Sequence, residues 1–314
     1  MGANIDFLIC HIYALVKYVN IFIGFMRKID VLEPKGYCAG VANAIRIAKD
    51  VKDKHPHQEV YVLGMLVHNQ IVIDELEQYG IHSIYGKDIE SEVKKLAKDS
   101  VVIYTAHGHT KRLESLVNSL GLVSYDAVCG KVKFNLTLIN DYLSKGHEVI
   151  YIGKSGHPEA LAATLDMEGV YLYDVDSEFD FAQIQDPSPL VLNQTTLNIS
   201  SLKNIHQKIA KKIPQAEFKD EICNATRLRQ ENIINLSSSV DLILVVGDTR
   251  SSNSNRLLEI AKAYHPNVPS RLINSVKDLD SNLLENKNHI AIASGASTPI
   301  SSIDMIVEYL NNFR

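Results

Sequence analysis

The sequence predicts an α/β protein in which three similar parallel-sheet lobes surround a common centre in a pseudo-threefold arrangement. Apolar, β-branched runs alternate along the chain with stretches of helical periodicity, which is typical of parallel sheets covered by helices. Cys38, Cys129 and Cys223 recur at intervals of 91 and 94 residues, so the pattern has a period of a little over 90 residues. We therefore expect an N-terminal extension over 1–25, followed by lobes over 26–125, 126–219 and 220–314.

The expected strands are short apolar runs rich in β-branched residues, as strands that are buried on both faces require. In chain order they are 29–32 (IDVL), 60–63 (VYVL), 101–104 (VVIY), 149–152 (VIYI), 190–192 (LVL), 241–246 (DLILVV) and 289–293 (HIAIA). We assign the first three to the first lobe and two to each of the others.

The expected helices carry apolar residues at steps of three and four. They cover 41–51, 69–78, 253–263 and 300–310. Ligands of open α/β sheets bind outside the carboxyl ends of the strands. Three sheets with these ends facing one another would therefore gather the following loops around one cavity.

Composition limits the classes of function. A net charge of −5 without a basic run argues against a general nucleic-acid binder, so an anionic small substrate would be held by local donors. Four cysteines without a CxxC pair form neither a disulfide framework nor a zinc ribbon. Sparse cysteines of this kind fit a reducing compartment, and we expect a cytoplasmic protein.

The N-terminal extension stands apart from the repeat. Residues 7–25 are largely apolar and just long enough to span a bilayer, although His11, Lys17 and Asn20 interrupt them. The segment lacks the features of a secretory signal. We favour a dispensable extension ahead of a start at Met26, over a membrane-associated helix or a helix packed on the body. Cys10 lies in this segment, outside the repeat.

Cys38 lies between an expected strand and an expected helix, whose N-terminus would stabilise a thiolate. Cys129 repeats this placement after a short apolar run, and Cys223 does so before a further helix. Gly36 and Gly40 flank Cys38 and permit close backbone approach. A single cysteine of this kind would be interpreted as a buried turn residue, but three in register indicate a metal centre. We interpret it as an iron–sulfur centre with one open iron, while a zinc site completed by a histidine also fits the spacing.

Polar loop residues follow each cysteine in a similar rhythm. They are His68, His107, His157, Thr195, Asn253 and Ser297. Counted from each cysteine, the steps are 30 and 39, 28 and 38, and 30 and 44 residues. A lone loop histidine is usually a surface residue, but three at matching positions are better explained as donors to one anion.

Two loops have the composition of a phosphate cradle. The run 247–255 (GDTRSSNSN), which includes Ser251 and Ser252, precedes an expected helix, and 294–299 reads SGASTP. Hydroxyls, amides and helix N–H groups together bind phosphate well, although an N-cap in a flexible loop has the same composition.

Glu159 is the carboxylate that we single out within these loops, two residues after His157. Beside a bound anion and metal, a carboxyl group could hold and deliver a proton. A solvated glutamate at the start of a helix is the alternative interpretation.

Taken together, these motifs resemble the 4-hydroxy-3-methylbut-2-enyl diphosphate reductases, also called LytB-type reductases. The matching segments are GYCAGV at 36–41, VHN at 67–69, AHG at 106–108, DAVCG at 126–130, GHPE at 156–159, QTTL at 194–197, IC-x-AT-x-x-RQ at 222–230, SSNSNRL at 251–257 and GASTP at 295–299. They occur in the family's order from about Met26 to the end of the chain. Val128 and Gly130 depart from the family, which usually has threonine and proline there.

The resemblance implies one [4Fe–4S] cluster per chain, held by Cys38, Cys129 and Cys223, with one open iron that binds the allylic hydroxyl of the substrate. Two electrons and two protons would remove this hydroxyl as water, giving isopentenyl and dimethylallyl diphosphates at the end of the non-mevalonate pathway. An external donor such as ferredoxin or flavodoxin would supply the electrons.

The resemblance also implies roles for the loop residues. Glu159 would supply protons and Thr195 would orient the hydroxyl. The residues implied to hold or lie near the diphosphate are His68, His107, His157, Ser251, Ser252, Asn253 and Ser297.

Two alternatives stay open at this point. A zinc-dependent hydrolase of a phosphorylated small molecule would use the three cysteines and a histidine. A cluster-binding sensor on the same fold would hold the cluster without turnover.

Overall fold

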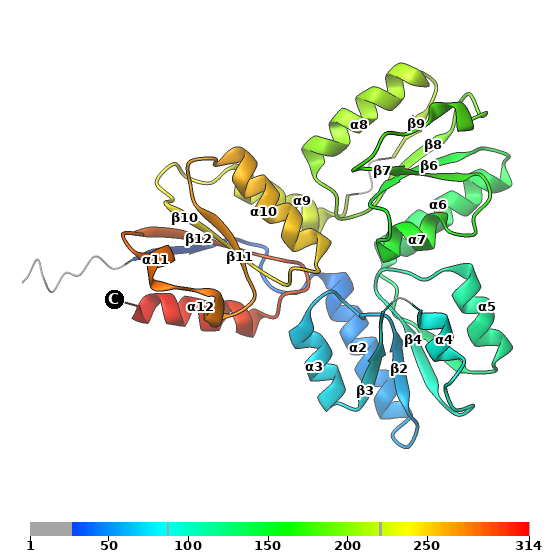
Figure 1. The fold of residues 1–314 in the computed structure, drawn as a ribbon, viewed down its shortest axis with the longest axis horizontal. Helices are drawn as coiled ribbons and strands as arrows, with labels where there is room; N and C mark the ends of the chain where they lie inside the picture. Colours follow the sequence, from blue (N-terminus) through cyan, green and yellow to red (C-terminus); the bar gives the residue numbers. More distant parts are fainter. Residues whose placement is uncertain (1–26, 87, 220–221, 314) are drawn as a thin grey trace, which may run out of the picture.

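The structure, a computed structural model, describes residues 27–86, 88–219 and 222–313. Within these residues, three four-stranded parallel sheets form three lobes around a common centre (Figure 1). The expected α/β class with parallel sheets is therefore confirmed. The extension over 1–25, and with it our interpretations of that segment and of Cys10, lies outside the described residues. Among the described helices, none is both long and apolar enough to cross a bilayer.

The first lobe has a two-sided core. Its strands, in spatial order, are β3 (Ile81–Ile84), β2 (Val60–Leu63), β4 (Val101–Tyr104) and β5 (Val123–Asp126). Its helices are α2 (Ala39–Lys54) and α3 (Gln70–Gln78) on one face and α4 (Ile89–Val93) and α5 (Lys111–Ser119) on the other. Alternate residues of β2 and β4 enter the two cores, because successive side chains of a strand point to opposite faces.

The second lobe repeats this arrangement. Its strands, in spatial order, are β7 (Val170–Asp174), β6 (Val149–Gly153), β8 (Leu190–Asn193) and β9 (Glu217–Phe218). Its helices are α6 (Gly130–Ser144) and α7 (Pro158–Thr164) on one face and α8 (Ile199–Lys212), with the 3₁₀ turn η1 (Phe181–Gln183), on the other.

The third lobe has the same strand order but draws on both ends of the described chain. Its strands, in spatial order, are β11 (Ser270–Ile273), β10 (Leu242–Val246), β12 (His289–Ser294) and β1 (Lys28–Val31). Its helices are α9 (Asn224–Ile234) and α10 (Ser252–Tyr264) on one face and α11 (Ser281–Leu284) and α12 (Ile300–Asn312), with the 3₁₀ turn η2 (Val276–Asp278), on the other.

The position of β1 corrects one expectation. We assigned this strand to the first lobe, but it pairs in parallel with β12, from Lys28 opposite His289 to Val31 opposite Ile292. In each sheet the fourth strand lies beside the third, and in the third lobe the N-terminal strand takes this place. The lobe boundaries that we expect along the chain remain a prediction.

Among the described residues, every strand that the apolar runs did not predict lies at the edge of its sheet. These strands are β3, β5, β7, β9 and β11. An edge strand has a neighbour on one side only and carries more polar residues, so its apolar run is short or broken. In β5, for example, three of the four residues are exposed.

The path of the chain explains why one cysteine falls in each period. Cys38 follows β1 and begins α2, so it joins the sheet of the third lobe to the first lobe. Cys129 likewise joins β5 to α6, and Cys223 joins β9 to α9. Each cysteine thus lies in a connection, or crossing, from one lobe to the next. The three crossings close the ring of lobes and meet at its centre.

Candidate active site

A cavity of about 690 Å³, its open mouth included, lies where the three lobes meet. It is lined by all twelve residues that the sequence singled out. They are Cys38, His68, His107, Cys129, His157, Glu159, Thr195, Cys223, Ser251, Ser252, Asn253 and Ser297. The expectation that the post-strand loops gather around one cavity is therefore confirmed, while the role of each residue remains a prediction.

The backbone of each cysteine is held in the same way. Its N–H donates a hydrogen bond to a carbonyl in the loop that follows the third strand of the preceding sheet. The pairs are Cys38 with Ala296 at 2.9 Å, Cys129 with Ala106 at 3.0 Å and Cys223 with Thr195 at 3.1 Å. Three equivalent bonds thus fix the three crossings around the cavity.

The three thiols are free and each occupies a helix N-cap position. The Cys38 and Cys223 sulfurs each accept a backbone N–H three residues further on, at 3.4 Å. Burial raises the pKa of Cys129, and the other two thiolates raise it further, while the amides of Lys131 and Val132 oppose this. Three thiolates so placed repel one another unless a cation lies between them.

Gly40 leaves room for the sulfurs. A Cβ atom added there would lie 2.6 Å from Cys129 Sγ and 3.9 Å from Cys38 Sγ. Within the part of the chain that the structure describes, no three His, Cys, Asp or Glu side chains are arranged to hold a single metal ion. The sulfurs instead line a shared space that a side chain at residue 40 would enter.

The three predicted histidines pack against one another at the cavity wall. The rings of His68 and His107 stack at a centroid distance of 4.1 Å, and His157 meets both edge-on at 5.7 and 5.8 Å. Burial lowers the pKa of all three, to about 3 for His157 and well below the usual value for His107. Neutral imidazoles can donate N–H groups to an anion, whose charge would raise their pKa again.

Several polar atoms at the cavity lack a partner within the described protein. Asn253 is 4% exposed, yet both its amide nitrogen and its amide oxygen are unpaired, and so is His107 Nδ1. Buried polar groups are normally hydrogen-bonded, and an unpaired one costs about 1–3 kcal/mol. These atoms are therefore available to a polar ligand.

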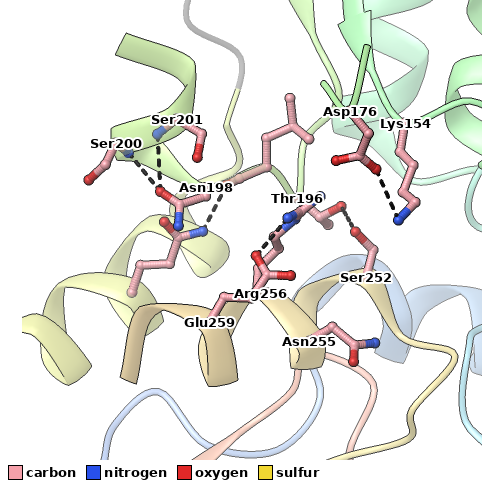
Figure 2. A network of polar contacts seen from close by, with 12 residues as sticks. Lys154, Asp176, Thr196, Asn198, Ser200, Ser201, Ser252, Asn255, Arg256 and Glu259 are labelled. Carbon is pink, nitrogen blue, oxygen red and sulfur yellow. Dashed lines mark hydrogen bonds and ion pairs between the residues drawn. The ribbon is translucent and has the colours of Figure 1, made fainter. Parts of the chain in front are cut away.

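The second and third lobes touch at the N-terminus of α10. Thr196 Oγ1 donates to Ser252 Oγ at 3.1 Å (Figure 2). Gln194 Nε2 donates to the same two oxygens, to Thr196 Oγ1 at 3.0 Å and to Ser252 Oγ at 3.4 Å. Ser251 caps the same helix and accepts the Ser254 N–H at 3.3 Å. A helix N-terminus with serine hydroxyls at the cavity favours a bound anion.

Ser297 belongs to the third lobe but is anchored to the first. Its hydroxyl donates to the carbonyl oxygen of His68 at 3.1 Å. The predicted anion-binding residues of different lobes thus hold one another in place.

Glu159 is buried beside the cavity at 2% exposure. One carboxylate oxygen accepts the Thr195 N–H at 2.9 Å and the Tyr151 hydroxyl at 3.1 Å, and the other accepts the Thr195 hydroxyl at 2.9 Å. Burial raises the pKa of Glu159 to about 7, although these three hydrogen bonds oppose the shift. The carboxyl group can therefore exchange a proton near neutral pH.

The structure also corrects the register of the repeat. The carbonyls that receive the cysteine N–H groups belong to Ala106, Thr195 and Ala296, so the counterpart of His107 and Ser297 is Thr196. Thr196 also lines the cavity and follows His157 by 39 residues, the same step as from His68 to His107. Thr195 instead occupies the position that anchors a cysteine, which leaves its hydroxyl to Glu159.

Tyr151 is a site residue that the sequence did not reveal. It lies in a continuous apolar strand, is fully buried and belongs to the core of the second lobe. Its sequence context is that of a core tyrosine, and only its contact with Glu159 shows a further role.

The family model described as "LytB protein" matches residues 29–311 of this chain. Among the similar proteins, the 4-hydroxy-3-methylbut-2-enyl diphosphate reductase of Lysinibacillus sphaericus is 35% identical over 284 residues, which are 90% of this chain and 87% of that protein. The enzyme of the same name from Symbiobacterium thermophilum is 36% identical over 286 residues, with coverages of 90% and 96%.

Two solved structures share the fold. The E-1-hydroxy-2-methyl-but-2-enyl-4-diphosphate reductase from Plasmodium falciparum superimposes with a TM-score of 0.82 at 28% identity, covering 91% of this chain and 89% of that one. A structure described as (E)-4-hydroxy-3-methyl-but-2-enyl diphosphate reductase, the terminal enzyme of the non-mevalonate pathway, gives a TM-score of 0.64 at 26% identity, with coverages of 92% and 100%.

The buried position of Glu159 predicts a pH-dependent effect on stability. Its pKa is raised from 4.5 to about 7 on folding, so its contribution is fully present below pH 4.5 and is lost as the pH rises through 7. The unfolding free energy of Glu159→Gln minus that of the wild type should therefore rise by about 3 kcal/mol from pH 4 to pH 8, because only the wild type loses this contribution. Denaturant unfolding at both pH values measures this, with the exposed Glu308→Gln on α12 as the control; an equal difference at both pH values would contradict it.

Proposed function

The chain belongs to the LytB protein family, and from this premise we propose that its central cavity is the active site of a 4-hydroxy-3-methylbut-2-enyl diphosphate reductase. The reaction removes the allylic hydroxyl of the substrate reductively and yields isopentenyl and dimethylallyl diphosphates, the last step of the non-mevalonate pathway. The observation that carries the proposal is the meeting of three free cysteines, unpaired buried anion donors and a carboxyl of neutral pKa in one cavity.

We propose one [4Fe–4S] cluster per chain, with Cys38, Cys129 and Cys223 as ligands and one iron without a protein ligand. The residues present fit such a group, because three free thiols at helix N-termini line a common space that only glycine at residue 40 leaves open. When bound, the cluster would supply the electrons and a Lewis-acidic iron for cleavage of the C–O bond.

The diphosphate is assigned to the wall that the three histidines share with the third lobe. His107 and Asn253 offer buried polar atoms without a protein partner among the described residues, His68 stacks on His107, and Ser251 and Ser252 add hydroxyls at the N-terminus of α10. The remaining residues assigned to this wall are His157 and Ser297. Because the donors come from all three lobes, a bound diphosphate would be enclosed by the whole ring.

Glu159 and Thr195 are assigned to proton delivery. The leaving oxygen must be protonated to depart as water, and a carboxyl with a pKa of about 7 still carries a proton for this at neutral pH. The Thr195 hydroxyl lies 2.9 Å from the carboxylate and also lines the cavity, so it can orient a substrate hydroxyl toward that proton. The Tyr151 hydroxyl donates to Glu159 Oε1 at 3.1 Å and so helps to fix the orientation of the carboxylate.

Electrons would come from an external protein such as ferredoxin or flavodoxin, because the sequence carries no convincing nucleotide-binding fingerprint. We place the reaction in the cytoplasm, where a reducing environment keeps cysteines of this kind free.

The test is anaerobic purification of the full chain, followed by analysis of iron, sulfide and zinc and by turnover of the hydroxylated diphosphate with a strong reductant. About four irons and four sulfides per chain, as a [4Fe–4S] centre contains, with turnover, would support the proposal. Zinc without sulfide would indicate the hydrolase. A full cluster that never turns over would indicate a sensor.

Replacing the proposed proton donor should largely abolish turnover without changing the cluster content. We expect Glu159→Gln to keep its iron and sulfide while losing at least about a hundredfold in kcat, because general acid catalysis contributes about 10²–10⁴. The wild-type rate should fall as the pH rises above 7, where the carboxyl loses its proton. Steady-state kinetics from pH 6 to 9 measure both effects, and wild-type turnover in the variant would exclude Glu159 as the proton source.

Gly40→Ala should reduce cofactor loading without unfolding the protein. The new Cβ would approach Cys129 Sγ to 2.6 Å and displace a ligand, whereas alanine favours a helix over glycine by about 1 kcal/mol. Gly130→Ala is the matched control, because it lies beside Cys129 and its added Cβ would meet no atom within 4 Å. Iron and sulfide per chain and thermal melting give the result; equal loading in the two variants would show that the space at Gly40 is not needed.

A further inference from the structure

Arg229 is a charged side chain buried at the centre of the ring, with 3% exposure. Its hydrogen bonds go to three backbone carbonyls, those of Gly36 at 2.7 Å and of Ala225 and Ser294 at 3.0 Å. These carbonyls belong to the loop before Cys38, to the first turn of α9 and to the end of β12. One guanidinium group thus joins three segments that approach the cavity.

In the part of the chain that the structure describes, no carboxylate forms an ion pair with Arg229. Burial lowers its pKa, and the charges that oppose this shift are, in order, those of Cys38, Cys223 and Glu33. A buried cation is costly unless it is compensated. The strongest compensating charges here are two of the three cysteine thiolates.

The fold does not require a charge at this position. Arg229 lies six residues after Cys223, and the residues six after Cys38 and Cys129 are Ala44 and Asn135, both buried. The amide of Asn135 donates to the carbonyl of Asn193 at the end of β8, as Arg229 donates to that of Ser294 at the end of β12. A neutral residue therefore serves the equivalent helix–sheet contact in the second lobe.

We propose that Arg229 is a positioning residue that also raises the reduction potential of the centre held by the cysteines. The inference rests on the proposed function. It assigns to Arg229 a fixed positive charge beside two of the three ligands and a clamp on the loops that carry them. Reduction adds an electron to a site that is already negative, so a buried neighbouring cation favours the reduced form.

The test uses the full chain, purified anaerobically, as wild type, Arg229→Gln, Arg229→Lys and Arg46→Gln. Iron and sulfide per chain measure how well Arg229 positions the loops that carry the cysteines. The midpoint potential, followed by electron paramagnetic resonance, measures the effect of its charge. Arg46 is the matched control because it lies on α2, the helix that Cys38 begins, but is exposed and paired with Asp50.

In Arg229→Gln the ratio of reduced to oxidised centre at a fixed applied potential should be about tenfold lower than in the wild type. This corresponds to a midpoint potential about 59 mV lower for a one-electron couple. Arg229→Lys should keep the wild-type potential but lose iron, because an ammonium group cannot bond three carbonyls in the fixed geometry of a guanidinium. The control should match the wild type in both measurements.

An Arg229→Gln protein with full loading and the wild-type potential would overturn the inference. So would an Arg229→Lys protein whose potential falls as far as that of the glutamine variant. If Arg229→Gln holds no cluster, the potential of Arg229→Lys decides alone. A wild-type chain without iron and sulfide would instead overturn the proposed function, and this inference with it.

Discussion

The architecture depends on the hydrogen bond between each cysteine N–H and a carbonyl in the loop after the third strand of the preceding sheet. The bond occurs three times, at 2.9, 3.0 and 3.1 Å, once at each crossing between lobes. Because the same loop also carries a cavity-lining residue, namely His107, Thr196 or Ser297, it aligns each cysteine with a polar residue of the cavity wall. The geometry of the centre is thus built into the connections between the lobes and does not depend on any one lobe.

Burial decides the chemistry of the residues at this centre. It lowers the pKa of the three histidines, which favours their neutral form, and it raises the pKa of Glu159 until the carboxyl can hold a proton at neutral pH. The unpaired polar atoms at the cavity, including both side-chain polar atoms of Asn253, are available to a polar ligand.

The ring is closed by the N-terminal strand and by Arg229. β1 supplies the fourth strand of the third sheet, so the chain leads from that sheet directly into Cys38. The guanidinium group then bonds the loop that follows β1, the end of β12 and α9. Although each lobe has its own two-sided core, the site exists only when all three are in place.

The sequence by itself determined the α/β class, the buried strands and the twelve cavity residues, because continuous apolar runs and a repeat marked by cysteines can be recognised along the chain. Most edge strands could not be predicted in this way, since a strand with one neighbour needs no unbroken apolar run. The tertiary structure alone decided that β1 belongs to the third sheet, because pairing between Lys28 and His289 joins residues that no local pattern connects. It also decided the roles open to Tyr151 and Arg229, whose sequence contexts are those of a core strand and a helix, and whose contacts come entirely from folding.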